Sequence, residues 1–104
     1  MFEGYIYLIN LTHNGNRIFK IGKTCDIGRR LHELQQQYSN VELLEYHKFS
    51  RADFAEDALH KMFSHKIYKG LRKSEELFSL NDEDIILFSE TVNSWLQNKP
   101  NWDQ

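Results

Sequence analysis

The sequence predicts an α/β fold of the α+β type, in which helices flank a small sheet of antiparallel strands. Apolar side chains alternate through residues 4–10 and 19–24, as they do on strands that bury one face. Between these runs lies Asn14-Gly15, the strongest short signal for a β-hairpin. Apolar residues then recur at helical spacing over about 27–38, 52–66 and 82–97.

The hairpin turn predicts the register of the first two strands. A two-residue loop at Asn14-Gly15 and a four-residue loop around it give the same pairing, in which Tyr7 lies opposite Gly22. Lys20 then lies diagonally from Tyr7, roughly 7 Å away. A three-residue loop would move Lys20 to the other face. The face opposite Tyr7 is the expected core face, with these residues on it: Ile6, Leu8, Phe19 and Ile21.

A first helix is expected to start at Asp26, whose side chain can cap it. Its apolar stripe consists of Ile27, Leu31, Leu34 and Tyr38. Arg30 falls at the edge of this stripe, so it can fold back over the sheet, whereas Arg29 points away. The helix is expected to end at residues 38–40.

A third strand is predicted over Val41–Phe49, with Val41, Leu43 and Glu45 on one face and Leu44, Tyr46 and Lys48 on the other. A second helix is expected from about 52 to 66, capped by Ser50. Glu56 and His60 lie four residues apart on the flank of its buried face. That face is expected to contain Phe54, Ala55, Ala58, Leu59, Met62 and Phe63.

The last part of the chain is expected to be structural. Residues 67–75 form an irregular basic loop, and a short extended segment follows over 75–80. Asn81 caps a C-terminal helix over about 82–97 that ends before Pro100. Its buried side is expected to contain Ile85, Phe88, Val92, Trp95 and Leu96. We expect Glu75 and Glu76 to serve structure or helix-end electrostatics rather than a second metal.

Length and composition indicate one globular domain over residues 1–104, with a motif core at 4–80. We expect a cytoplasmic protein without a membrane partner, because the sequence has no apolar run of transmembrane length and no charged-then-apolar leader. The single cysteine, Cys25, excludes an internal disulfide and a cysteine-based zinc site.

The charges are distributed unevenly. The net charge is −2, which by itself argues against nucleic acid as a partner. Residues 1–73 nevertheless carry 12 basic and 8 acidic side chains, and residues 74–104 carry 1 and 7. The region with the hairpin can therefore present a basic surface to phosphates.

Several motifs follow one another along the chain. The first is Tyr5-Ile6-Tyr7 and the second is Lys20-Ile21-Gly22, with Thr24 and Asp26 after it. Arg30 follows, and then Glu56 on a helix with Leu59 and His60 behind it, and Glu76-Leu77-Phe78. In this order the motifs resemble the GIY-YIG nuclease superfamily, and more closely its small phage-type subfamily with a Lys-Ile-Gly second motif. Two departures are Tyr5, where most members have glycine, and the lack of a clear match to a late asparagine.

The resemblance implies a three-stranded antiparallel sheet flanked by helices, and DNA cleavage that depends on one divalent ion, Mg²⁺ or Mn²⁺. Tyr7 matches the tyrosine that helps to deprotonate the attacking water, and Lys20 stands where many members have a second tyrosine. Arg30 matches the phosphate-binding arginine, and Glu56 matches the metal-binding glutamate. We therefore expect Tyr7, Lys20, Arg30 and Glu56 to converge in one cleft on the sheet face that carries Tyr7.

The residue chemistry is compatible with these roles. A phenol with an ordinary pKa near 10 is a poor base at neutral pH, and a nearby ammonium such as that of Lys20 favours its ionised form. Glycine at position 22 leaves room for a phosphate or water. One glutamate can suffice for Mg²⁺, which keeps several waters. His60 could orient a metal-bound water or shuttle a proton. The residues expected to contact the substrate are Tyr5, Gly22, Lys23 and Thr24.

The alternative is a binding module that keeps the nuclease fold without turnover and binds DNA or a protein partner. Two strand tyrosines are most often packing residues, and a lone helix glutamate usually faces solvent. The modest net charge favours this alternative, whereas the carboxylate of Glu56 beside a phosphate site favours the enzyme. A homodimer or a protein partner could supply targeting.

Overall fold

The structure is a computed structural model and describes residues 3–13, 15–69 and 77–103. Its strands are β1 (Gly4–His13), β2 (Asn16–Thr24), β3 (Val41–Phe49) and β4 (Leu77–Phe78). Its α-helices are α1 (Ile27–Gln37), α2 (Ala52–Met62) and α3 (Asp82–Gln97), with short 3₁₀ turns at Ser64–Lys66 and Asn101–Asp103. The predicted α+β fold is confirmed.

The sheet has four strands in the order β3-β1-β2-β4, one more than predicted. All neighbouring strands are antiparallel. The extra strand, β4, pairs with Phe19 and Lys20 of β2, and its Phe78 also forms an isolated bridge with Ile67. A two-residue strand is too short to show an alternation, so the sequence indicated the extended segment but not its pairing.

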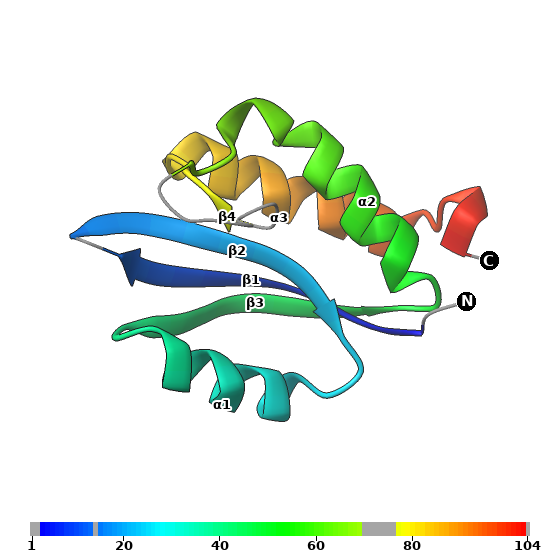
Figure 1. Ribbon diagram of the computed structural model, residues 1–104. Coiled ribbons are helices and arrows are strands. Elements are labelled where there is room, and N and C mark those ends of the chain that lie inside the picture. The colour runs from blue at the N-terminus through cyan, green and yellow to red at the C-terminus, as the bar shows by residue number, and fades with distance from the viewer. Residues whose placement is uncertain (1–2, 14, 70–76, 104) are drawn as a thin grey trace.

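Helices cover both faces of the sheet (Figure 1): α1 lies on one side, and α2 and α3 lie on the other. The core therefore has two parts. On the α2 and α3 side, the expected residues Ile6, Leu8, Phe19 and Ile21 pack with Ala52, Ala55, Leu59, Phe88 and Val92. On the α1 side, the buried residues are Tyr7, Ile9, Leu11, Ile18, Leu34 and Leu77.

The hairpin register is confirmed. His13 pairs with Asn16 and Tyr7 pairs with Gly22. Gly15 has a φ of 77°, which glycine adopts without steric cost. Lys20 pairs with Ile9, so it lies diagonally from Tyr7 on the same face.

A β-bulge in β3 changes which of its side chains share a face. Leu8 pairs with Glu45, but Ile9 pairs with Leu43, so Leu44 is an extra residue. The predicted alternation is therefore wrong beyond Leu44. Tyr46 lies on the face of Tyr7, and Glu45 points the other way, where it accepts a hydrogen bond from Ser89 of α3. One added residue inverts the alternation of a strand.

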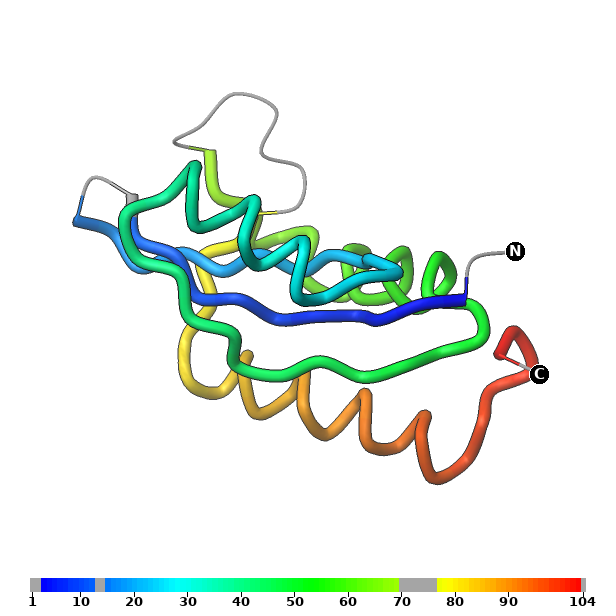
Figure 2. Tube along the Cα trace, turned by 90° about the horizontal axis from the view of Figure 1, so that it is seen from below, coloured from blue at the N-terminus to red at the C-terminus, as the bar shows by residue number. Residues whose placement is uncertain are grey.

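The first helix forms as predicted. The carboxylate of Asp26 accepts a hydrogen bond from the backbone N–H of Arg29, and Leu34 is buried. Seen from the α1 side, the start of β1 and the second half of β3 extend beyond α1 (Figure 2). Part of this sheet face is thus left uncovered by the helix.

The second helix differs from its prediction at both ends. Its N-cap is Arg51 and not Ser50, and the cap has no side-chain hydrogen bond. The backbone N–H of Arg51 instead donates to the carboxylate of Asp103 at 2.9 Å. The helix ends at Met62 and gives way to a 3₁₀ turn rather than continuing to 66. Phe54, predicted to be buried, is exposed, with the Arg51 guanidinium 3.9 Å from its ring centre.

The third helix begins as predicted with a capping box: the Asn81 side chain accepts from the Asp84 N–H, and the Asp84 carboxylate accepts from the Asn81 N–H. Phe88 and Val92 are buried. Leu96, predicted to be buried, is exposed, because it lies in the last turn of α3, beyond the buried residues Phe88 and Val92. Within the described ranges, no helix is both long enough and apolar enough to cross a membrane.

Candidate functional site

Tyr7 lies at the centre of the candidate site but is not open to solvent. It is 1% exposed, in the core beneath α1. Its ring lies over Gly22: a Cβ at Gly22 would stand 2.4 Å from the Tyr7 hydroxyl oxygen and 2.6 Å from Cζ. The space predicted for a phosphate or water is therefore filled by the phenol itself. Glycine is required here so that Tyr7 can reach across to β2.

Arg30 contacts Tyr7, as its position at the edge of the helical stripe predicted. Its Nε donates to the Tyr7 hydroxyl oxygen at 3.2 Å, and its Nη1 donates to Glu33 at 3.5 Å. Although burial lowers the pKa of Arg30, the contacts with Tyr7 and Glu33 raise it above its ordinary value. The guanidinium stays charged. It has five N–H donors, so these two contacts leave others for a ligand.

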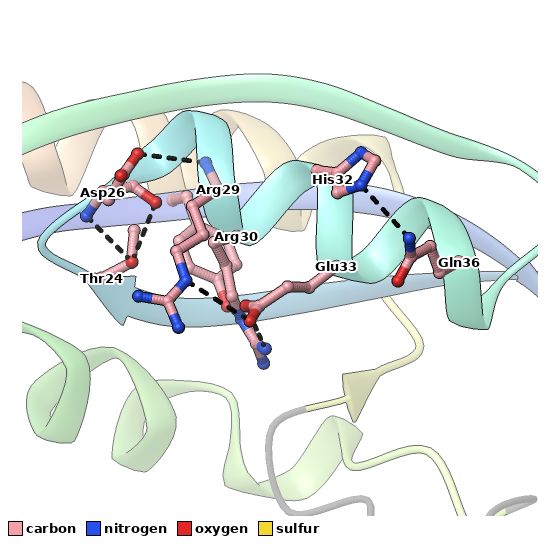
Figure 3. Close-up of polar contacts among 8 residues, drawn as sticks. Thr24, Asp26, Arg29, Arg30, His32, Glu33 and Gln36 are labelled. Atoms are coloured by element: carbon pink, nitrogen blue, oxygen red, sulfur yellow. Dashed lines mark hydrogen bonds and ion pairs between the residues drawn. The ribbon is translucent and has the colours of Figure 1, made fainter.

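Glu33 was not predicted as part of the site. It lies between Arg29, at 3.8 Å, and Arg30, at 3.5 Å, and both arginines extend toward it in Figure 3. The spacing of three and four residues along a helix is the signal that could have identified these pairs. Arg29 remains mostly exposed, as expected.

Glu56 forms an ion pair with Lys23, with 3.1 Å between its Oε1 and the Lys23 Nζ. The Glu56 side chain is only 13% exposed. Lys23 follows Gly22 in β2, so its side chain points to the opposite face, the one covered by α2. The predicted convergence of Tyr7, Lys20, Arg30 and Glu56 in one cleft on the Tyr7 face is therefore wrong.

Two half-sites instead lie on either side of β2. Tyr7 and Arg30 approach from the α1 face, at Gly22, and Glu56 binds Lys23, the next residue, from the α2 side. On β2, β4 pairs with Phe19 and Lys20. Among the described residues, no strand pairs with the outer edge of β2 beyond Lys20, and both half-sites lie at this part of β2.

His60 lies on the Glu56 side of this edge. Its Nε2 is 2.7 Å from the carbonyl oxygen of Ile21, and its ring packs against Phe78 with centroids 5.4 Å apart. A carbonyl only accepts, so Nε2 carries the hydrogen in this contact. The contact holds α2 to β2, and a role of His60 in proton transfer stays a prediction.

The other predicted site residues have distinct surroundings. Lys20 is buried, next to Leu77 of β4. Thr24 exchanges hydrogen bonds with the backbone of Asp26 and so shapes the turn into α1. The ring of Tyr5 packs against that of Tyr46. Of the predicted basic loop, residues 70–75 lie outside the described residues, as does Glu76.

Only part of a metal site is present. No group of three or more His, Cys, Asp or Glu in the described ranges is arranged to hold a metal. Glu56 offers one carboxylate, which Lys23 already contacts. Mg²⁺ accepts a single carboxylate when waters fill its other positions. The residues therefore fit a water-rich ion at Glu56 only if Lys23 moves aside.

A separate cavity of about 220 Å³ lies at the end of α3 and is lined by none of the residues Tyr7, Arg30 and Glu56. Its lining residues are Glu3, Lys48, Phe49, Ser50, Trp95, Leu96, Lys99 and Asp103. It mixes acidic and basic groups, so its charge selects no ligand class.

A comparison with protein families matches residues 4–97 to the T5orf172 domain. The chain belongs to this family. The T5orf172 domain is phage-associated, and the matched range includes both half-sites and the whole of α3. No curated protein and no solved structure matches the chain.

Proposed function

We propose that this T5orf172 domain is a metal-dependent DNA endonuclease of the GIY-YIG type. The main support is the pair of contacts at consecutive residues of one strand, β2: Tyr7–Arg30 over Gly22, and Glu56 on Lys23. Hydrolysis of a phosphodiester needs a cation for the phosphate, a base for the water and a carboxylate for a metal. These contacts supply one group of each kind.

Arg30 and Tyr7 act on the phosphate and the water. The remaining donors of Arg30 bind a phosphate oxygen, and a guanidinium beside a phenol favours the phenolate. Tyr7 is buried in the free domain, so the substrate must draw Arg30 outward and uncover the hydroxyl. Once the uncovered Tyr7 hydroxyl has lost its proton to solvent, the water oxygen bonds to phosphorus and the water proton passes to the phenolate oxygen. The bond from phosphorus to the leaving sugar oxygen breaks, and that oxygen takes a proton from solvent.

Lys23 and Glu56 complete the site. A phosphate at the edge of β2 attracts the Lys23 ammonium and so releases the Glu56 carboxylate. Glu56 would then hold Mg²⁺ or Mn²⁺, which stabilises negative charge on the phosphate and on the leaving oxygen when bound. Lys20 adds positive charge on the Tyr7 face.

The test is the separation of cleavage from binding. We expect Glu56→Ala and Tyr7→Phe each to abolish cleavage of supercoiled, linear and branched DNA with Mg²⁺ or Mn²⁺, while DNA affinity changes little. The matched control for Glu56 is Asp57→Ala, because Asp57 is the exposed neighbour that pairs with Lys61 on the same helix. The control for Tyr7 is Tyr38→Phe, at another tyrosine of the same core cluster. Equal cleavage by wild type and Glu56→Ala would contradict the proposal.

The second candidate is a DNA-binding module without turnover. The burial of Tyr7 and the ion pair on Glu56 favour it, because both groups are occupied in the free domain. It predicts that wild type binds DNA, with an affinity that falls steeply with salt, but cleaves no form of DNA with either metal. If no binding occurs even at low salt, a protein partner replaces DNA in this candidate.

A further inference from the structure

Two tyrosines, Tyr46 exposed and Tyr5 half-buried, form an aromatic surface that the proposed chemistry does not use. Tyr5 of β1 and Tyr46 of β3 pack edge to face, with ring centroids 5.8 Å apart and ring planes at 66°. Tyr46 is 49% exposed, which is high for a large aromatic side chain on a strand. We call Tyr5 and Tyr46 the tyrosine pair.

The tyrosine pair adjoins the Tyr7–Arg30 half-site through the sheet register. Tyr7 pairs with Tyr46 on one side and with Gly22 on the other, so these three residues form one row across the sheet. Paired residues share a face, and Tyr5 lies two residues from Tyr7 on that face. Tyr46 and Gly22 are two strand spacings apart, roughly 10 Å, which is the span of a few nucleotides.

The tyrosine pair lies on the face that α1 covers only in part. The start of β1 and the second half of β3, which contain Tyr5 and Tyr46, extend beyond α1 (Figure 2). The bulge at Leu44 is what brings Tyr46 to this face. A ligand bound at Arg30 can therefore continue along the sheet onto the tyrosine pair, of which Tyr46 is the exposed ring.

A lysine lies beside the tyrosine pair. Lys48 pairs with Tyr5 across β1 and β3, is mostly exposed, and also lines the cavity at the end of α3. Its ammonium is 3.3 Å from Glu3, which is equally exposed. Exposed ion pairs contribute little to stability, so a phosphate can take the place of Glu3. The acidic first turn of α3 lies on the opposite side of the sheet.

We propose that Tyr5 and Tyr46 stack against an unpaired nucleobase of the DNA strand whose phosphate binds at Arg30. The preferred substrate is thus single-stranded DNA, or a duplex with an unstacked base beside the cleaved bond. The inference rests on the proposed function for its DNA partner. A base inside a duplex already stacks on both of its faces, and taking it out costs a few kcal/mol. An aromatic surface therefore favours strands in which the base is already free.

The test compares the affinities of a single-stranded oligonucleotide and its blunt duplex, measured by fluorescence anisotropy at one salt concentration. We expect wild type to prefer the single strand and Tyr46→Ala to bind it about fivefold or more weakly, the usual cost of losing one stacked base. Duplex affinity should change little. Tyr46→Phe keeps the ring and should bind like wild type, and Leu87→Ala removes an exposed apolar side chain of α3 as an off-site control.

A second measurement uses the base analogue 2-aminopurine, whose fluorescence is quenched by stacking. We expect quenching of this base in the single strand by wild type and Tyr46→Phe, and weaker quenching by Tyr46→Ala. If Tyr46→Ala binds and quenches like wild type, or loses affinity equally for single strand and duplex, the stacking inference is wrong while a DNA endonuclease still stands. If wild type binds no DNA at all, the inference and the proposed function fail together.

Discussion

Gly22 shows how one missing side chain positions a buried phenol. The Tyr7 ring occupies the volume in which any other residue at position 22 would place its Cβ. The Tyr7 hydroxyl can therefore extend over β2 to Arg30. A glycine in a strand costs stability, and here the close approach of a buried phenol explains its presence.

We predict that Gly22→Ala destabilises the protein by about 1–3 kcal/mol, the usual cost of overpacking a core. The added methyl group would force the Tyr7 ring away from Arg30. Chemical denaturation measures the loss. The control is Gly28→Ala in α1, where the nearest atom would be the Asp26 Oδ1 at 3.7 Å, an ordinary contact. Because alanine favours helices, this control should be neutral or stabilising, and equal losses at both positions would contradict the packing argument.

Lys23 offers a second test at the scale of single residues. In the free domain its ammonium contacts the carboxylate that we propose for the metal. We predict that Lys23→Met tightens Mn²⁺ binding, because an ion no longer competes with the ammonium, and weakens DNA binding. Calorimetric titration with Mn²⁺ checks the first effect without any cleavage assay. Lys61→Met is the control, since Lys61 pairs with Asp57 on the same helix. Unchanged Mn²⁺ affinity in Lys23→Met would show that lysine and metal do not share Glu56.

At the scale of elements, the start of α3 combines a capping box with an ion pair. The Asp84 carboxylate accepts from the Asn81 N–H at 3.0 Å and lies 3.2 Å from the Lys66 ammonium. Burial raises the pKa of Asp84, but the Asn81 hydrogen bond and Lys66 outweigh it and lower the pKa below 3.8. The folded state thus favours the charged carboxylate, and α3 is joined to the segment after α2.

When folding lowers the pKa of a carboxylate, that carboxylate stabilises the folded protein at every pH above its pKa in the unfolded chain. The stabilisation is lost as the pH falls through the pKa that the carboxylate has in the folded protein. We predict that Asp84→Asn is less stable than wild type at neutral pH and that the difference shrinks as pH falls below 3.8. Thermal unfolding of both proteins across this range measures it. Asp82→Asn is the control because Asp82 is almost fully exposed. A difference that stays constant down to the lowest pH would show that the charge of Asp84 is not the cause.

At the scale of the whole molecule, the end of the chain stabilises its middle. Asp103 is 3% exposed and accepts a hydrogen bond from the backbone N–H of Arg51, the N-cap of α2. Trp102 packs against Phe49 and Trp95 close by. The C-terminal turn therefore fixes the start of the helix that carries Glu56.

We predict that Asp103→Ala lowers the free energy of unfolding by about 1–3 kcal/mol, since it leaves a buried N–H without its acceptor. Urea denaturation measures the loss. Asp82→Ala, at an exposed position, should change stability by less than about 0.5 kcal/mol. A near-neutral Asp103→Ala would mean that water replaces the carboxylate at Arg51.

The sequence by itself determined the local features of this protein. These features each depend on neighbours within a few residues. They are the alternation of Ile6 and Leu8 with Tyr5 and Tyr7, the Asn14-Gly15 turn, and the caps at Asp26 and Asn81. For this reason the hairpin register, the contact of Arg30 with Tyr7 and the limits of α1 and β3 could all be predicted.

Only the tertiary structure decided features that join distant parts of the chain. The bulge at Leu44 moved Tyr46 to the Tyr7 face, Asp103 replaced Ser50 at the start of α2, and β4 joined the sheet. The packing of α2 on the opposite face separated Glu56 from Tyr7. The physical reason is that a helical or strand period shows which side of an element is apolar. The packing of the whole chain decides which face of the sheet an element covers. It also decides which distant group forms a hydrogen bond with the backbone at the end of that element.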